Sequence, residues 1–146
     1  MLELMRALAE FEDYLQDFTV DRSALLQRAF GPAPQCQVFV AVADTSLRGY
    51  AVVLEVPFTY DLRPTLLLKE LYIEQGWRGR GLGQRLMQAV ARWGAGRGAG
   101  RLKWDVLAGN QAAETFYRHL GGRPDDKWIG YQMDSAALVR LAEGCI

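Results

Sequence analysis

The residues of this sequence whose types and spacing point most directly to chemistry lie in one arginine- and glycine-rich run, Arg78–Gly83 (RGRGLG). Before it the chain alternates as a strand does, and after it apolar residues recur at helical spacing from Leu82. A glycine-rich loop that opens a helix leaves the first backbone N–H groups of that helix free, and these add to the positive end of the helix dipole. Phosphate groups bind at such helix starts, and glycine helps because no Cβ keeps them from the backbone. The run therefore predicts a phosphate-binding loop, to which Arg78 and Arg80 add cationic donors.

Three known glycine patterns compete for this loop. A P-loop is excluded because the sequence contains no Gly-Lys pair. The dinucleotide pattern G-x-G-x-x-G fails because the third glycine, Gly83, comes one residue early. The remaining pattern is R-x-x-G-x-G, which Arg78, Gly81 and Gly83 fill. A flexible surface loop is the alternative without chemistry, and the strand before it and the helix after it disfavour that interpretation.

Length and composition limit the class of protein. A chain of 146 residues predicts one domain over residues 1–146. The 17 basic and 17 acidic residues cancel, which disfavours a nucleic-acid partner. No apolar run reaches the length of a membrane span, and the first residues lack the apolar core of a signal peptide. Cys36 and Cys145 lack the number and spacing of a disulfide framework or a metal site. We expect a cytoplasmic protein with neither a membrane partner nor a metal.

Periodicity predicts a mixed α/β fold in the order ααβββαβαβ, followed by a short terminal helix. The predicted helices are residues 2–16, a helix capped by Asp21 that stops before Gly31, a helix that opens at Gly81, and residues 111–120 and 135–143. The predicted strands are residues 37–43, 49–56, 65–73, 101–107 and 128–133. The third strand starts with an apolar run and is expected near the middle of the sheet. The strands that the Gly81 helix joins are expected to be parallel.

Four features have a structural and a functional interpretation. The acidic end of the first helix, which includes Glu12, is either a solvated face or a wall that attracts a cation. The loop 58–64 (FTYDLRP) is either a substrate rim or a packed loop. The second glycine cluster, Trp93–Gly100, follows a helix instead of opening one, so we expect a helix stop and a mobile connector. His119 lies in the last turn of its helix, where a histidine interacts favourably with the negative end of the helix dipole. It is not expected to be a catalytic base.

A second motif, N-x-x-A-x-x-F-Y-x-x-x-G, is filled by Asn110, Ala113, Phe116, Tyr117 and Gly121. Together with R-x-x-G-x-G it resembles the two signatures of the GNAT superfamily of N-acetyltransferases, which bind acetyl-CoA. The segments LAEFEDY, FTYDLRP and KELYI look like the diamine (spermidine/spermine-type) branch and its bacterial relatives. The resemblance implies a GNAT-like fold, although this chain lacks the short first strand with which the superfamily usually begins. It also implies a homodimer.

The resemblance implies a place for acetyl-CoA along the chain. The backbone of the third strand would pair with the pantetheine arm, the glycine loop would hold the pyrophosphate, and the second motif would flank the thioester. The implied cofactor-binding residues are Leu71, Tyr72, Ile73, Arg78, Gly79, Arg80, Gly81, Leu82, Gly83, Gln84, Asn110 and Tyr117. In the family the tyrosine at the position of Tyr117 protonates the leaving thiolate. A phenol suits that step because its pKa, near 10, lies above that of a thiol, near 8.5.

The acceptor amine must lose a proton before it attacks, because an alkylamine is almost entirely ammonium at neutral pH. Glu70, just before the implied cofactor segment, is the expected base, acting directly or through water. The diamine branch has two adjacent acids here, whereas this chain has Lys69 before Glu70. Neighbours on a regular strand face opposite ways, so Lys69 would then point away. The carboxylates expected to line an amine channel are Glu12, Asp61, Glu70, Asp105 and Asp126.

These observations predict an N-acetyltransferase that moves acetyl from acetyl-CoA to a primary amine of a small molecule by direct attack. The acceptor is expected to be a polyamine, a diamine or an amino-acid-like amine. Neither cysteine lies in a signature segment, which disfavours a covalent acetyl-enzyme. The alternatives are a non-catalytic acetyl-CoA-binding module, and an acetyltransferase that acts on a peptide or protein amine or on an aminoglycoside.

Overall fold

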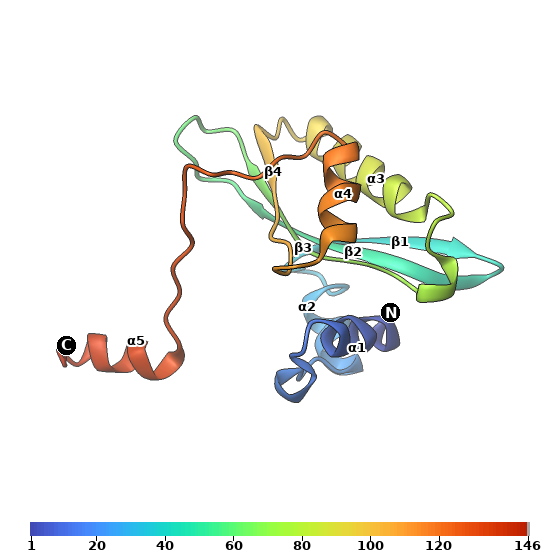
Figure 1. The fold of residues 1–146 in the computed structure, drawn as a ribbon. Coiled ribbons are helices and arrows are strands. Elements are labelled where there is room, and N and C mark those ends of the chain that lie inside the picture. Colours follow the sequence, from blue (N-terminus) through green and yellow to red (C-terminus); the bar gives the residue numbers. More distant parts are fainter. Residues whose placement is uncertain (146) are drawn as a thin grey trace. The chain divides into compact units, whose positions relative to one another are not determined.

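The computed structural model describes residues 1–145 and shows a mixed α/β fold, as predicted (Figure 1). The chain forms two compact units, the first being Met1–Asn110 and the second beginning at Gln111. The single domain expected from the length stays a prediction. Among residues 1–145, no helix has the length and apolar character needed to cross a membrane.

The first unit is built on one four-stranded sheet in the order β1-β2-β3-β4. Its strands are β1 (Gln37–Ala43), β2 (Ser46–Val56), β3 (Thr65–Ile73) and β4 (Arg101–Lys103). The pairs β1-β2 and β2-β3 are antiparallel. The pair β3-β4 is parallel, as expected for strands joined by the crossover helix α3 (Leu82–Gly96). β3 is an internal strand, as predicted, whereas β4 stops four residues short of the predicted Leu107.

Helices lie on both faces of this sheet (Figure 1). On one face are α1 (Leu2–Phe11), the 3-10 helix η1 (Leu15–Asp17) and α2 (Arg22–Arg28), and on the other is α3. Met5 and Leu8 of α1 form a buried cluster with Tyr50 and Val52 of β2. The first helix ends earlier than the predicted residue 16, because Asp13 takes a left-handed φ of 62° that a continuing helix does not allow. Asp21 caps α2 as predicted, since its carboxylate accepts a hydrogen bond from the Ala24 N–H at 2.8 Å.

A β-bulge interrupts the pairing of β2 with β3. Val52 lies opposite Glu70 and Val53 lies opposite Leu68, so Lys69 is the extra residue on β3. One extra residue resets the alternation of side chains between the two faces. Lys69 and Glu70 therefore share a face, the one that α1 covers, and both line one cavity there. The expectation that Lys69 points away from Glu70 is wrong, because it assumed a regular strand.

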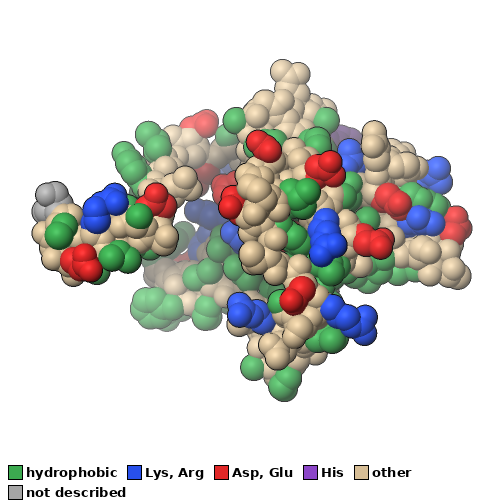
Figure 2. Space-filling model, turned by 90° about the horizontal axis from the view of Figure 1, so that it is seen from below, with side chains coloured by type: hydrophobic (Ala, Val, Ile, Leu, Met, Phe, Trp, Pro, Cys, Tyr) green, Lys and Arg blue, Asp and Glu red, His purple; other side chains and the backbone are tan. Residues whose placement is uncertain are grey.

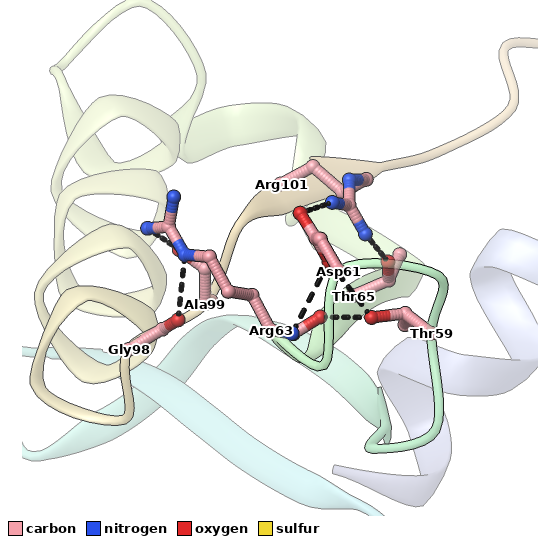
Figure 3. Close-up of polar contacts among 7 residues, drawn as sticks. All are labelled: Thr59, Asp61, Arg63, Thr65, Gly98, Ala99 and Arg101. Atoms are coloured by element: carbon pink, nitrogen blue, oxygen red, sulfur yellow. Dashed lines mark hydrogen bonds and ion pairs between the residues drawn. The ribbon is translucent and has the colours of Figure 1, made fainter.

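The loop before β3 is held in place by hydrogen bonds and an ion pair (Figure 3). Asp61 forms an ion pair with Arg101 of β4 and accepts a hydrogen bond from the Thr59 hydroxyl at 2.9 Å. Arg101 also donates to the Thr65 hydroxyl at 2.7 Å. Arg63 donates to the carbonyl of Ala99, at the end of the connection from α3, at 3.0 Å. These contacts fasten the loop to the start of β3 and to β4, but its aromatic side chains are not packed, since Phe58 is 86% and Tyr60 91% exposed.

The second unit contains α4 (Gln111–His119) and α5 (Ser135–Ala142), close to the predicted helices. The predicted strand over residues 128–133, and with it the last strand of the predicted order, is wrong: these residues form no strand. A strand needs a neighbour for its backbone hydrogen bonds, and no strand among residues 1–145 pairs with this segment. Its apolar side chains are open to solvent, with Ile129 83% and Tyr131 95% exposed. Apolar side chains also stand at the surface of α5 beside charged ones (Figure 2).

The second glycine cluster includes part of α3 and is not only a connector. Gly94 is buried where α3 approaches β3, and a Cβ on it would stand 2.5 Å from Cδ1 of Leu66. Gly96 is two residues further along the same helix, is exposed, and has nothing within 4 Å of such a Cβ. The sequence shows two similar glycines, and only packing distinguishes them.

We therefore expect opposite effects from the same substitution at these two glycines. Gly94→Ala should lower the free energy of unfolding by about 1–3 kcal/mol, because the methyl group overpacks a buried contact. Gly96→Ala should raise it by about 0.4–1 kcal/mol, because alanine reduces the freedom of the unfolded chain. Urea unfolding of both variants measures the difference. Equal effects would contradict the close approach of α3 to β3 at Gly94.

Candidate active site

A cavity of about 350 Å³ lies under the α1 face of the sheet, at the bulge. β3 contributes two charged side chains to it, and the segment from α1 to the start of α2 contributes the rest. The lining residues are Met5, Glu12, Tyr14, Phe18, Val20, Lys69 and Glu70. All of them belong to the first unit. Two carboxyl groups and one ammonium group thus meet among apolar and aromatic side chains.

Glu70 is the most constrained of these acids. The hydroxyl of Tyr50, a fully buried residue of β2, donates a hydrogen bond to Glu70 Oε1 at 3.0 Å. Burial raises the pKa of Glu70, and the charge of Glu12 raises it further. The Tyr50 hydrogen bond and the charge of Lys69 act in the opposite direction, but the net pKa lies above the ordinary glutamate value. Glu70 is therefore a better proton acceptor than a glutamate in water.

The other groups around this cavity are also affected by low polarity. Burial raises the pKa of Glu12. The pKa of Tyr14 is raised by burial and then by the charges of Glu70 and Glu12. The pKa of the Cys36 thiol is raised by burial and by Glu70, so this thiol is held in its neutral form. The cavity can bind a cation at its two carboxyl groups and take a proton from it.

The glycine loop connects β3 to α3 through the 3-10 helix η2 (Gln75–Trp77). Gly81 is the N-cap of α3 with a φ of 79°, a conformation that glycine adopts without steric cost. Because glycine has no side chain, the N-cap residue itself offers no side-chain acceptor to the first amides of α3. Residues 79–81 are exposed. The loop therefore has the free amides and the access that a phosphate needs.

The two arginines of the loop have different contacts. Arg78 Nε donates to the carbonyl of Ile73 at 2.9 Å, and its guanidinium lies 5.3 Å from the centre of the Tyr72 ring. The Arg80 guanidinium lies 4.5 Å from the centre of the Trp77 ring, and Arg48 lies 4.6 Å from the same ring. Arg78 thus ties the loop to the end of β3, which fixes the start of α3 relative to that strand.

β3 has a free side at the same end. β4 pairs with β3 only from Thr65 to Leu67, so among residues 1–145 no strand pairs with Leu71–Ile73 on the side opposite β2. An extended, amide-containing ligand can add to such an edge as a strand does. The Glu70 carboxylate, the free edge and the amides of α3 therefore follow one another along one continuous stretch of chain.

The structure brings together some of the predicted substrate residues and separates others. Glu12 and Glu70 share the cavity. Asp61 is fastened beside Thr65, roughly 16 Å along β3 from Glu70, and its ion pair with Arg101 gives it a structural role. Asp105 is an exposed residue after β4, and Asp126 is an exposed residue of the second unit. Neither is among the residues that line the cavity.

The two residues of the second motif that are implied to bind acetyl-CoA, Asn110 and Tyr117, lie at and beyond the boundary between the units. Asn110 is the last residue of the first unit. Tyr117 lies on α4, where its ring contacts Phe116 edge-to-face at 5.1 Å between centroids. The functions expected of both stay predictions.

Sequence reasoning missed Tyr50 and Tyr14. Tyr50 comes from β2 and reaches Glu70 only because of the register that the bulge sets. A tyrosine flanked by glycine and alanine in a strand carries no motif, so only the strand pairing reveals it. Tyr14 lies in the acidic segment after α1, where its contact with the cavity follows from the chain reversal at Asp13.

Comparisons of the sequence and of the structure with known proteins both point to acetyltransferases. Residues 5–121 match the family model described as the acetyltransferase (GNAT) family. The mouse (Mus musculus) thialysine N-epsilon-acetyltransferase is 24% identical, in an alignment that covers 97% of this chain and 89% of that protein. An integron cassette protein from V. cholerae superposes with a TM-score of 0.79 at 24% identity, over 97% of this chain and 91% of that one. An aminoglycoside N-acetyltransferase in complex with CoA superposes with a TM-score of 0.65 at 23% identity, over 91% and 90% of the two chains.

The raised pKa of Glu70 predicts how the stability of the fold depends on pH. A glutamate with a raised pKa in the folded state stabilises the fold when protonated, and this stabilisation is lost as the pH rises through that pKa. Glu70→Gln imitates the protonated form and keeps an acceptor for Tyr50. We therefore expect its melting temperature to exceed that of the wild type by a few degrees at neutral pH. The difference should shrink below the ordinary glutamate range.

Glu55→Gln is the matched control. The hydrogen bond from Arg97 lowers the pKa of Glu55, so its ionised form stabilises the fold. This variant should melt below the wild type at neutral pH, and again the difference should shrink in acid. Thermal denaturation from acid to neutral pH checks both signs. A Glu70→Gln variant that melts below the wild type at neutral pH would contradict the assigned pKa direction.

Proposed function

The chain belongs to the acetyltransferase (GNAT) family, and we propose that it transfers an acetyl group from acetyl-CoA to the primary amine of a small molecule by direct attack. Membership of this family, together with its resemblance to named acetyltransferases, makes it an N-acetyltransferase. Acetyl-CoA is the acetyl donor of the family. The nature of the acceptor and the roles of individual residues are the proposal.

The observation that carries the proposal is the half-buried Glu70 carboxyl group, hydrogen-bonded to Tyr50 at 3.0 Å in a cavity next to the free edge of β3. An acceptor amine enters as ammonium and is attracted by Glu12 and Glu70. Glu70, whose pKa is raised by burial, accepts its proton directly or through a water molecule. The amine nitrogen then attacks the thioester carbonyl, the carbon–sulfur bond breaks, and the nitrogen releases its second proton to water as the amide forms. Tyr117 is our proposed donor of the proton that the departing CoA thiolate takes.

Acetyl-CoA would bind along the stretch from β3 to the start of α3. The free edge at Leu71–Ile73 suits the amide-containing pantetheine arm. The backbone amides from Gly79 to Gln84, around the start of α3, suit the pyrophosphate, with Arg80 near it. The guanidinium of Arg78 donates a hydrogen bond to the carbonyl of Ile73 and so fastens the loop to the end of β3.

The cavity favours a small linear acceptor. Its volume of about 350 Å³ lies at the low end of the range for ligand sites, about 300–1,000 Å³. This is more compatible with an amino-acid-like or diamine acceptor than with a multi-ring aminoglycoside, although acetyltransferases for both thialysine and aminoglycosides resemble this chain.

We also propose a cytoplasmic homodimer. The exposed apolar side chains of Trp128 and Ile129 support a contact with another chain.

The glycine loop yields a prediction about CoA binding. Gly81→Ala places a Cβ on a residue with a φ of 79°, which strains the start of α3 and adds a methyl group where the phosphates would lie. We expect the dissociation constant of CoA, measured by calorimetry, to rise at least about tenfold. Gly96→Ala, at the far end of the same helix, should leave it unchanged. Wild-type affinity in Gly81→Ala would remove the loop from the CoA site.

The test of the function is release of free thiol from acetyl-CoA with putrescine, spermidine, thialysine, lysine, an aminoglycoside and a short peptide as acceptors. We expect turnover with a small amine. Tyr117→Phe should then lower kcat by about 10²–10⁴, the usual contribution of a general acid, with little change in CoA affinity. Tight binding of acetyl-CoA without turnover of any amine would favour the non-catalytic binding module. Full activity of Tyr117→Phe would exclude that residue as the acid.

A further inference from the structure

The charge pattern of the cavity beside Glu70 is unusual for a site that would hold a diamine. Two carboxyl groups, those of Glu12 and Glu70, share the cavity with the ammonium group of Lys69. With both acids ionised, these three groups sum to one negative charge. The remaining lining side chains, Met5, Tyr14, Phe18 and Val20, carry no charge at neutral pH.

The backbone itself holds Lys69 at this cavity. In a regular strand Lys69 and Glu70 would face opposite sides of the sheet. The bulge at Lys69, with Val52 opposite Glu70 and Val53 opposite Leu68, brings both side chains to the α1 face. The charge of Lys69 also acts on Glu70, whose pKa it lowers against the larger effect of burial. The ammonium group is therefore part of the electrostatic environment of the site.

We infer that Lys69 makes this cavity selective for an acceptor amine that also carries a carboxylate. The inference rests on the proposed acetyl transfer and names its substrate class. The reacting ammonium group is attracted by Glu12 and Glu70, and the carboxylate of the same molecule pairs with Lys69. A diamine would instead bring a second ammonium group towards Lys69. Like charges that share one small site oppose binding, so Lys69 disfavours polyamines as well as favouring amino acids.

Three linear amines of matched length separate the charges that matter. Lysine carries two ammonium groups and a carboxylate, cadaverine is its decarboxylated form, and ε-aminocaproate keeps the carboxylate but lacks the second ammonium group. For each we would measure kcat/KM in the thiol-release assay and, separately, the dissociation constant by calorimetry with CoA bound. The wild type should prefer both carboxylate-bearing amines to cadaverine by at least about tenfold.

Substitutions at Lys69 test the cause of the preference. Lys69→Glu should reverse the order of lysine and cadaverine, and Lys69→Gln, which removes the charge with little change in shape, should bring them together. Arg92→Glu makes the same charge change on an exposed residue of α3 and should leave the ratio unaltered. Melting curves confirm that each variant is folded.

The outcomes separate this inference from the proposed function. Equal use of lysine and cadaverine by the wild type, or a ratio that both Lys69 variants leave unchanged, would overturn the inference and leave acetyl transfer standing. The expected order of dissociation constants without any turnover would support the inference and argue against catalysis. Failure of all three amines both to bind and to react would overturn the inference.

Discussion

The single extra residue in β3 is the constraint on which the site depends. Sheet pairing allows a side chain only two directions, and a regular β3 would place Lys69 and Glu70 on opposite faces. The bulge places both on the face that α1 covers, beside Tyr50 and under the acidic end of the first helical segment. The cost is a local interruption of the ladder, and the consequence is a charged cavity within an otherwise apolar layer.

That cavity shows a conflict between stability and chemistry. A carboxyl group that accepts a proton from an amine must be held where its ionised form is poorly solvated, which is also where its charge opposes folding. The hydrogen bond from the buried Tyr50 hydroxyl offsets part of this cost by stabilising the ionised form of Glu70. The Met5, Leu8, Tyr50 and Val52 cluster keeps that hydroxyl in place, so the apolar packing of α1 against β2 also orients the polar site.

The proposed acetyl-CoA site depends on the point at which β4 stops pairing with β3. β4 accompanies β3 for only three residues, and beyond them the strand continues with an open side to Ile73. Arg78 then hydrogen-bonds the carbonyl of Ile73, and the chain turns at Gly81 into α3. A proton acceptor, an open strand edge and free helix amides thus lie in series along residues 70–84. This order suits a long ligand that ends in phosphates at one end and in a reactive group at the other.

Local features of the fold could be predicted from the sequence because they depend on residues close together in the chain. The bounds of β1 and β3, the cap at Asp21, the helix that opens at the glycine loop and the parallel pairing of β3 with β4 all match the prediction. The family resemblance rests on motifs of the same local kind, and the family match confirms it.

Features that depend on partners distant in the chain could not be predicted. The alternation in residues 128–133 predicts a strand, but a strand forms only where an edge accepts it. Asp61 has the negative charge expected of a residue that binds an amine substrate, but in the structure it forms an ion pair with Arg101. The sequence by itself determined most of the helices and strands and the glycine loop. Only the tertiary structure decided that Lys69 and Glu70 meet Tyr50 and Glu12, because packing across the sheet sets the register between β2 and β3.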